Sequence, residues 1–75
     1  MPEEEFTVWI CYPDFHDRVV DHVDAGTAVR RAADLTRSKA IQLLCERVII
    51  TDGGDDTVFE WQPSKGVTFP PLGRV

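Results

Sequence analysis

The side chains best able to do chemistry gather in the first third of the chain. They are Cys11, Asp14, His16, Asp17, His22 and Asp24. Thiolate, imidazole and carboxylate groups bind zinc and serve as the nucleophiles, acids and bases of catalysis. Cys11 and His22 fall on one face of a predicted hairpin, but no H-E-x-x-H motif or oxyanion site accompanies them. A Cys/His-dependent enzyme or a metal protein is therefore the last of our hypotheses, and we expect no catalytic residue and no cofactor.

A second polar cluster, residues 52–56, reads Asp-Gly-Gly-Asp-Asp. Three carboxylates and two glycines superficially suggest a loop for calcium or phosphate. The alternating oxygen ligands and late Glu of an EF-hand are absent, and the carboxylates would repel a phosphate. The segment therefore predicts a hairpin turn, in which Gly53 or Gly54 adopts the positive φ that β-branched residues avoid.

The charges weigh against some partner classes and leave one open. The formal net charge of −5 disfavours binding to nucleic acid or anionic membranes, which needs clustered lysine and arginine. Arg30, Arg31 and Arg37 nevertheless lie on the polar side of a predicted helix. A binder of nucleic acid or of an acidic partner through these arginines is therefore our second functional hypothesis, although a solvated helix face, balanced by the carboxylates of this acidic chain, accounts for them better.

Alternation and turn residues divide the chain into the short elements that would position these groups. Strands are predicted at 6–12, 18–23, 47–51 and 57–62, with a short edge strand at 67–69 as a further option. Residues 24–46 have helical spacing, with Asp24 or Thr27 as N-cap, and Ser38 as the cap of a second helix if the first does not continue. The predicted fold class is α+β: a small four-stranded, mainly antiparallel sheet in strand–strand–helix–strand–strand order with one helical layer on one face.

Length and composition indicate a single domain over residues 1–75, with a frayed N-terminus at 1–5 and a C-terminal tail at 70–75. No apolar run approaches the roughly 18–20 residues that span a membrane, and the acidic N-terminus differs from a secretory signal. The expected localisation is therefore cytoplasmic, with Cys11 and Cys45 as reduced thiols. The expected core comprises Phe6, Val8, Ile10, Val19, Val29, Ala33, Leu44, Val48, Ile50, Phe59 and Trp61.

The first strand has apolar side chains on both of its faces. Phe6, Val8 and Ile10 share one face because strand side chains alternate, and Trp9 and Cys11 share the other. One helical layer covers a single face of a small sheet, so the second face needs a partner, unless residues 38–46 fold across it. This open face is predicted to present an interface of Trp9, Cys11, Val20, Ile49 and Val58. Our leading hypothesis is a non-enzymatic protein–protein interaction module, a homodimer or a docking partner of another protein, that binds through this face or an edge strand.

The order of the elements, with a small-residue helix opening at an Asp-x-x-Thr step, resembles several small bacterial domains, among them antitoxins of the HicB type. The resemblance covers Phe6 to Gln62 and is one of pattern. The glycine-rich, solvent-facing second strand of the HicB type is replaced here by Arg18-Val19-Val20. The resemblance implies a fold and a habit of binding partner proteins, and it gives no residue a role.

Overall fold

The computed structural model describes residues 5–69, which form five strands and two helices. The strands are β1 (Phe6–Cys11), β2 (His16–Val23), β3 (Arg47–Thr51), β4 (Thr57–Gln62) and β5 (Gly66–Phe69), and the helices are α1 (Ala25–Thr36) and α2 (Lys39–Leu44). The predicted tail at 70–75 lies outside the described residues, as does the predicted frayed N-terminus apart from Glu5.

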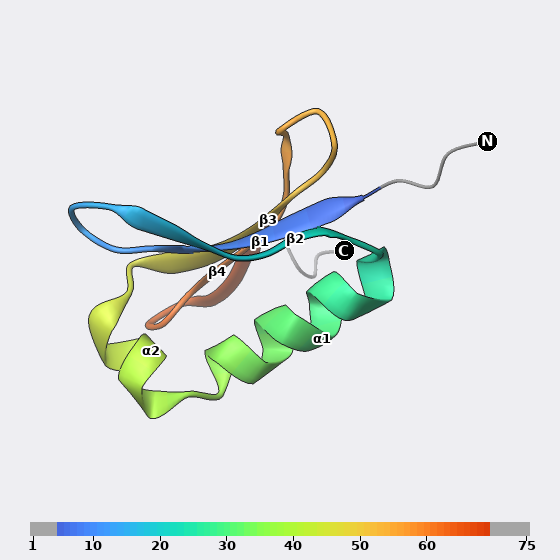
Figure 1. The fold of residues 1–75 in the computed structure, drawn as a ribbon. Helices are drawn as coiled ribbons and strands as arrows, with labels where there is room; N and C mark the ends of the chain where they lie inside the picture. Colours follow the sequence, from blue (N-terminus) through green and yellow to red (C-terminus); the bar gives the residue numbers. More distant parts are fainter. Residues whose placement is uncertain (1–4, 70–75) are drawn as a thin grey trace, which may run out of the picture.

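All neighbouring strands of the sheet are antiparallel, in the order β2-β1-β3-β4-β5 (Figure 1). The predicted α+β class is confirmed, whereas the predicted count of four strands is wrong. The chain turns after Gln62, whose carbonyl accepts a hydrogen bond from the N–H of Lys65 at 3.1 Å. Gly66, with a φ of 78°, then lets the chain reverse onto β4 as the edge strand β5.

The helices separate at Ser38, so the structure has two helices rather than one bent helix. The backbone of Ser38 is extended, and its hydroxyl accepts a hydrogen bond from the N–H of Ile41 at 3.3 Å, as an N-cap does. α1 begins in the same way, because the Asp24 carboxylate accepts from the N–H of Thr27 at 3.2 Å. Hydrogen bonding by Thr27, first through its side chain, lowers the pKa of Asp24.

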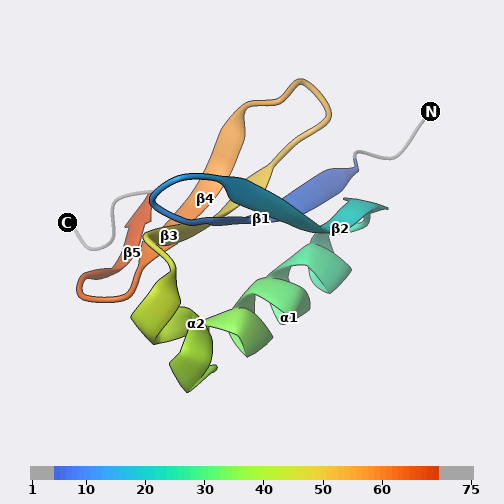
Figure 2. The same ribbon diagram turned by 60° about the vertical axis from the view of Figure 1, so that its left-hand side comes forward.

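Both helices lie on one face of the sheet, and the core lies between the two layers (Figures 1 and 2). The buried apolar residues are Val8, Ile10, Ala28, Ala32, Cys45, Val48 and Ile50. The small side chains of Ala28 and Ala32 let α1 approach the sheet closely where Val8 and Val48 are fully buried.

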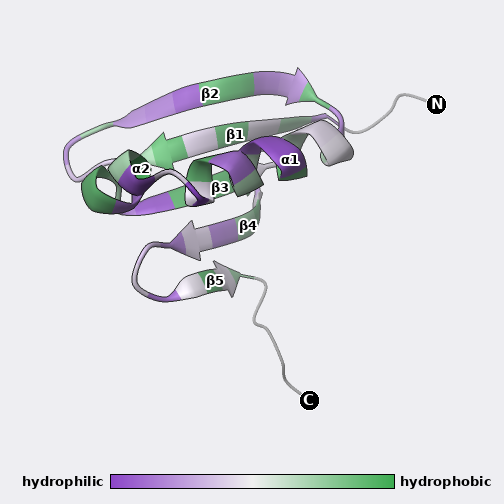
Figure 3. Cartoon of the chain, turned by 90° about the horizontal axis from the view of Figure 1, so that it is seen from below, coloured by the Kyte–Doolittle hydropathy of each residue, from purple (hydrophilic) through white to green (hydrophobic). Residues whose placement is uncertain are grey.

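Two residues expected in the core are exposed instead. Val29 is 61% exposed because it follows Ala28, and one residue turns the helix by about 100° away from the face that packs on the sheet. Leu44 is 63% exposed because the buried position at the end of α2 falls on Cys45. Figure 3, which views the helices from their outer side, shows this hydrophobic end of α2 beside the hydrophilic stretches of α1.

β2 bulges against β1, and the bulge changes which side chains share a face. Val8 pairs with Val20 but Trp9 pairs with Arg18, so Val19 is an extra residue in β2. Directly paired residues lie on the same face. Val20 therefore lies with Val8 against the helices, and its predicted place on the open face is wrong. The strict alternation of the prediction fails because one extra residue reverses every side chain that follows.

Positive φ values within residues 5–69 fall on His22 and Asp55 as well as on a glycine. His22, with a φ of 56°, lies at a second irregularity of β2. In the turn between β3 and β4, Asp55 adopts a φ of 66°, and the predicted positive φ at Gly53 or Gly54 is wrong. The Asp55 N–H donates to the Asp52 carbonyl at 3.0 Å, so the two glycines form the centre of a turn and the residue after them takes the left-handed conformation.

Gly66→Ala is expected to lower the free energy of unfolding by about 1 kcal/mol, because an L side chain strains a left-handed backbone. An added Cβ meets no atom within 4 Å at Gly66 or at Gly53, so crowding plays no part at either position. Gly53→Ala is the matched control, and it should be neutral or slightly stabilising because this glycine has no positive φ. Urea unfolding measures both variants, and equal effects would contradict the turn that creates β5.

Candidate interaction face

The sheet face turned away from the helices, here termed the open sheet face, carries no covering element within residues 5–69 (Figure 1). At its centre Trp9 of β1 pairs directly with Ile49 of β3, so an indole and an aliphatic side chain lie side by side. Around this pair lie Cys11, His16, Arg47, Thr51, Asp55, Thr57, Glu60 and Phe69. The face is therefore an apolar centre with a polar and charged surround.

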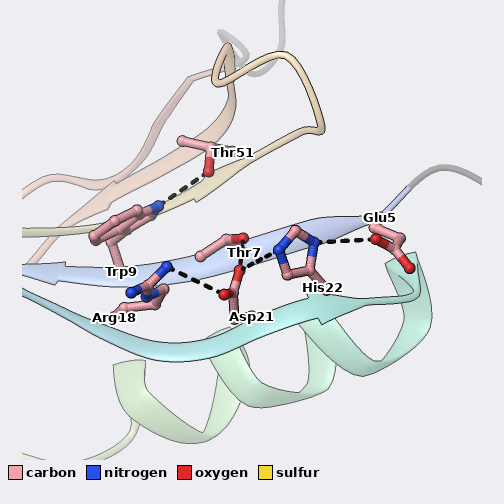
Figure 4. Close-up of polar contacts among 7 residues, drawn as sticks. All are labelled: Glu5, Thr7, Trp9, Arg18, Asp21, His22 and Thr51. Atoms are coloured by element: carbon pink, nitrogen blue, oxygen red, sulfur yellow. Dashed lines mark hydrogen bonds and ion pairs between the residues drawn. The ribbon is translucent and has the colours of Figure 1, made fainter.

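Trp9 is held in place by three neighbours. Its indole N–H donates to the Thr51 hydroxyl at 3.0 Å, which ties β1 to β3 (Figure 4). The His16 ring meets the indole edge-on with centroids 5.1 Å apart, and the Arg18 guanidinium lies 5.7 Å from the ring centre. A side chain that is already fixed loses little conformational entropy when a partner covers it, and this favours binding.

Two hollows join on the open sheet face to form a trough. The larger, of about 490 Å³, lies beside Trp9, and the smaller, of about 380 Å³, lies beside Phe69. Arg47, Ile49 and Thr57 line both hollows, so the trough extends from β1 across β3 and β4 to β5. It is wide open to solvent, whereas small ligands are usually bound in clefts that enclose most of their surface. The shape is better suited to another protein surface.

The charged groups of the trough are spread along β3. Arg47 lies where β3 begins, Asp55 lies in the turn after it ends, and Ile49 lies between them. Arg47 is 3.9 Å from Glu60 on β4, a weak and partly exposed ion pair. Asp55 makes no ion pair with any residue in the described range 5–69. Along the direction of β3, the trough therefore has Arg47, with Glu60 beside it, on one side of Ile49 and the carboxylate of Asp55 on the other.

A polar network borders the open sheet face along the bulged strand β2 (Figure 4). Asp21 accepts hydrogen bonds from the Thr7 hydroxyl at 2.8 Å and from Arg18 at 3.1 Å. The His22 ring lies between Asp21, at 3.4 Å, and Glu5, at 3.0 Å. These groups are largely exposed, so each contact contributes little stability alone, but together they hold the end of β2 beside β1.

The predicted interface residues divide between the trough and other places. Trp9, Cys11 and Ile49 line the trough, and Val20 packs with the core. Val58 lines neither hollow, because β4 has a bulge at this residue and Thr57 takes the place opposite Thr51. Val58, which was predicted on the open sheet face, therefore lies outside the trough.

Sequence reasoning missed five residues of the trough: His16, Arg47, Asp55, Thr57 and Phe69. Arg47 stands two positions before Ile49, so alternation in β3 is a signal that could have identified it. Phe69 belongs to β5, which the sequence predicted only as an optional edge strand at 67–69. Thr57 depends on a bulge that no sequence pattern marks.

The structure keeps Cys11 and His22 apart, so the Cys–His pair considered for the first hairpin does not form. The register places His16 directly opposite Cys11, whereas His22 lies near the far end of β2 beside Glu5. Cys11 is half-buried, and Cys45 is buried in the core, where desolvation and then the nearby Cys11 raise the pKa of the Cys45 thiol. Both cysteines are free thiols.

The three arginines of the second hypothesis are exposed on α1 and partly engaged within that helix. Arg37 forms an ion pair with Asp34, three residues earlier. Arg30 donates to the Thr27 hydroxyl at 3.3 Å. Such contacts hold the guanidinium groups along the helix surface, as in an ordinary solvated face.

Comparison with protein families, with curated proteins and with solved structures gave no match to this chain. The resemblance to HicB-type antitoxins therefore stays a prediction. Neither of the helices in the described range is long and apolar enough to cross a bilayer. Among residues 5–69, no three His, Cys, Asp or Glu side chains are grouped so that they could hold a metal ion.

Thr51→Val is expected to lower the free energy of unfolding by about 1 kcal/mol, because the Trp9 indole N–H loses its acceptor while the side chain keeps its shape. In a Trp9→Phe background the same substitution should cost much less, since no indole N–H remains to be satisfied. Thr51→Ser, which keeps the hydroxyl, is the control. Denaturant unfolding of the four-member cycle measures the coupling, and equal costs in both backgrounds would show that the bond does not support the fold.

Alkylation should distinguish the two thiols in the folded protein. Cys11 is expected to react with iodoacetamide at neutral pH, and Cys45 to react far more slowly, because its raised pKa leaves less thiolate and its sulfur is buried. The Cys45 rate should rise only at pH above the ordinary range of a thiol. Peptide mass spectrometry measures both rates, with denaturant as the control that makes them equal. Equal rates in the folded protein would contradict the burial of Cys45.

Proposed function

We propose that this chain is a non-enzymatic protein–protein interaction module that binds its partner through the open sheet face. The observation that supports this most directly is Trp9, fixed by the Thr51 hydroxyl and set beside Ile49 on a face that the helices leave uncovered. Binding energy at protein interfaces concentrates in central aromatic and aliphatic anchors surrounded by polar groups. The trough has this arrangement, with the charged residues Arg47 and Asp55 before and after Ile49 along the direction of β3.

The face is a better binding surface than either edge of the sheet. Edge strands recruit partners through unpaired backbone groups, and bulges and short length weaken this. β2 is irregular against β1 at two places, which interrupts the row of groups that another strand would need. β5 has only four residues and a register shift of its own. Both edges therefore offer poor templates for an added strand.

Helix α1 offers less support for the second hypothesis, a nucleic-acid or acidic-protein binder. Two of the three arginines, Arg30 in α1 and Arg37 at its C-cap, already bond to side chains of α1. The exposed Val29 directly precedes Arg30 in the helix. Phosphate contacts draw their strength from several uncommitted cations, and this helix presents few.

A photoreactive amino acid placed at Thr57 tests the proposed function in the protein's own cell. Thr57 is exposed and lines both hollows, so the probe should form adducts with protein. The matched control positions are Leu43, which is 84% exposed on α2, and Arg31 on α1.

Replacing Arg30, Arg31 and Arg37 together by Gln should leave the Thr57 adduct and the melting temperature nearly unchanged, because exposed ion pairs contribute only about 0–1 kcal/mol.

Two results would contradict the proposal. Nucleic-acid adducts at position 31 that disappear in the triple Gln variant would establish the helix face as the functional surface. Protein adducts at position 43 without any at position 57 would move the interaction to α2. Both readouts come from the same irradiated samples, by mass spectrometry of the linked products.

A further inference from the structure

The charge of the trough changes along the direction of β3, from Arg47, only weakly paired with Glu60 at 3.9 Å, to Asp55. Arg47 lies at the start of β3 and Asp55 lies past its end, and both side chains are exposed and line the same hollow. Trp9 and Ile49 lie between them as a directly paired apolar centre. Because the Arg47–Glu60 pair is long and partly exposed, the Arg47 guanidinium can still meet a carboxylate of a partner. A surface with this cation before an apolar centre and an anion after it, along the strand direction, is complementary to its own reversed copy.

A two-fold symmetric dimer can bring two such faces together with their strands reversed. Identical chains associate most often about a two-fold axis, which brings the same patch of each chain into contact. When two sheets pack face to face, the axis lies in the plane between them, and an axis across the strands reverses the direction of β3. Arg47 of each copy then lies over the partner's Asp55, and the Trp9–Ile49 pairs of both copies meet in the middle.

The size of the sheet is compatible with a weak, reversible dimer. Five strands spaced by about 4.8 Å and about 20 Å long give roughly 480 Å² of flat area per copy, or roughly 1,000 Å² for the pair before side-chain relief is counted. This is near the lower limit for a specific protein interface. Two facing sheets of this kind pack about 10 Å apart with their strands inclined by about 30°.

We infer that the occupant of the open sheet face is a second copy of this chain, packed with its strands reversed so that Arg47 pairs with the partner's Asp55. The inference rests on the proposed function and names the partner of the same face. It predicts one residue pair at each end of the interface and an indole–aliphatic contact at the centre. It also explains why Asp55 makes no ion pair with other described residues of its own chain.

Charge reversal at the two ends gives a specific test by sedimentation velocity over a range of concentrations. The parent chain should approach twice its mass of 8.5 kDa as concentration rises. Arg47→Glu and Asp55→Lys should each raise the dimer dissociation constant at least about tenfold, because like charges then face each other at both ends. An equimolar mixture of the two variants should dimerise again, since both charge pairs of the mixed dimer attract. If Arg47 and Asp55 interacted only within one chain, mixing the two variants would not restore the dimer.

Further variants separate the possible outcomes. Trp9→Glu should remove the dimer, and Val29→Glu, an exposed change on α1, should not. Far-UV circular dichroism confirms that each variant is folded, and Arg47→Gln and Asp55→Asn replace any charge reversal that unfolds the chain. Loss of the dimer in Trp9→Glu without recovery by mixing would overturn the reversed packing. A parent that stays monomeric while Thr57 links to a different protein would overturn self-association and leave the proposed function standing.

Discussion

The two helices of residues 5–69 cover only one face of the five-stranded sheet, and the organisation of the described molecule depends on that single packed layer. The helical layer lies close to the sheet because alanines make the closest contacts of α1 with the strands. Ala28 and Ala32 bring the backbone of α1 down onto Val8 and Val48, which are fully buried. The second helix has six residues and leaves Leu43 and Leu44 outside the packed layer. No helical residue of the described range is left to shield the opposite face of the sheet.

Contacts among its own side chains keep the open sheet face ordered although neither α1 nor α2 packs on it. Its largest apolar side chain, Trp9, has its only polar atom bonded to Thr51 and its ring bordered by His16 and Arg18. Threonines and charged residues interrupt the apolar area, so no wide hydrophobic patch forms. Fixing these side chains in the free protein also lowers the entropy lost when a partner binds. The same contacts therefore stabilise the isolated fold and prepare the face for an interaction.

Local chemistry in the sequence was enough to predict the α+β class, both hairpins, the caps at Asp24 and Ser38, and the centre of the open face at Trp9 and Ile49. Each of these depends on residues close together in the chain. Val20 was misplaced, and Val58 lies outside the trough, because bulges in β2 and β4 arise from how neighbouring strands twist together, which no single-strand pattern reveals. β5 was predicted only as an optional edge strand, because its pairing depends on one left-handed glycine. Val29 and Leu44 were expected in the core and are exposed. Helical spacing identifies the apolar side of a helix, but the packing of the helix on the sheet determines which residues of that side are buried.

The position of β1 in the sheet has a consequence for the order of folding. β1 pairs with β2 through a short turn, but it also pairs with β3, which begins 36 residues after β1 ends if counted from Cys11 to Arg47 (47 − 11 = 36). Contacts between neighbours in sequence form faster than contacts that close a long loop. We therefore expect the β1–β2 and β3–β4 hairpins to form as separate units and to join along the β1–β3 seam in the slow step. Until the seam closes, each hairpin exposes an unpaired strand, and a second chain in the same state can supply the missing neighbour.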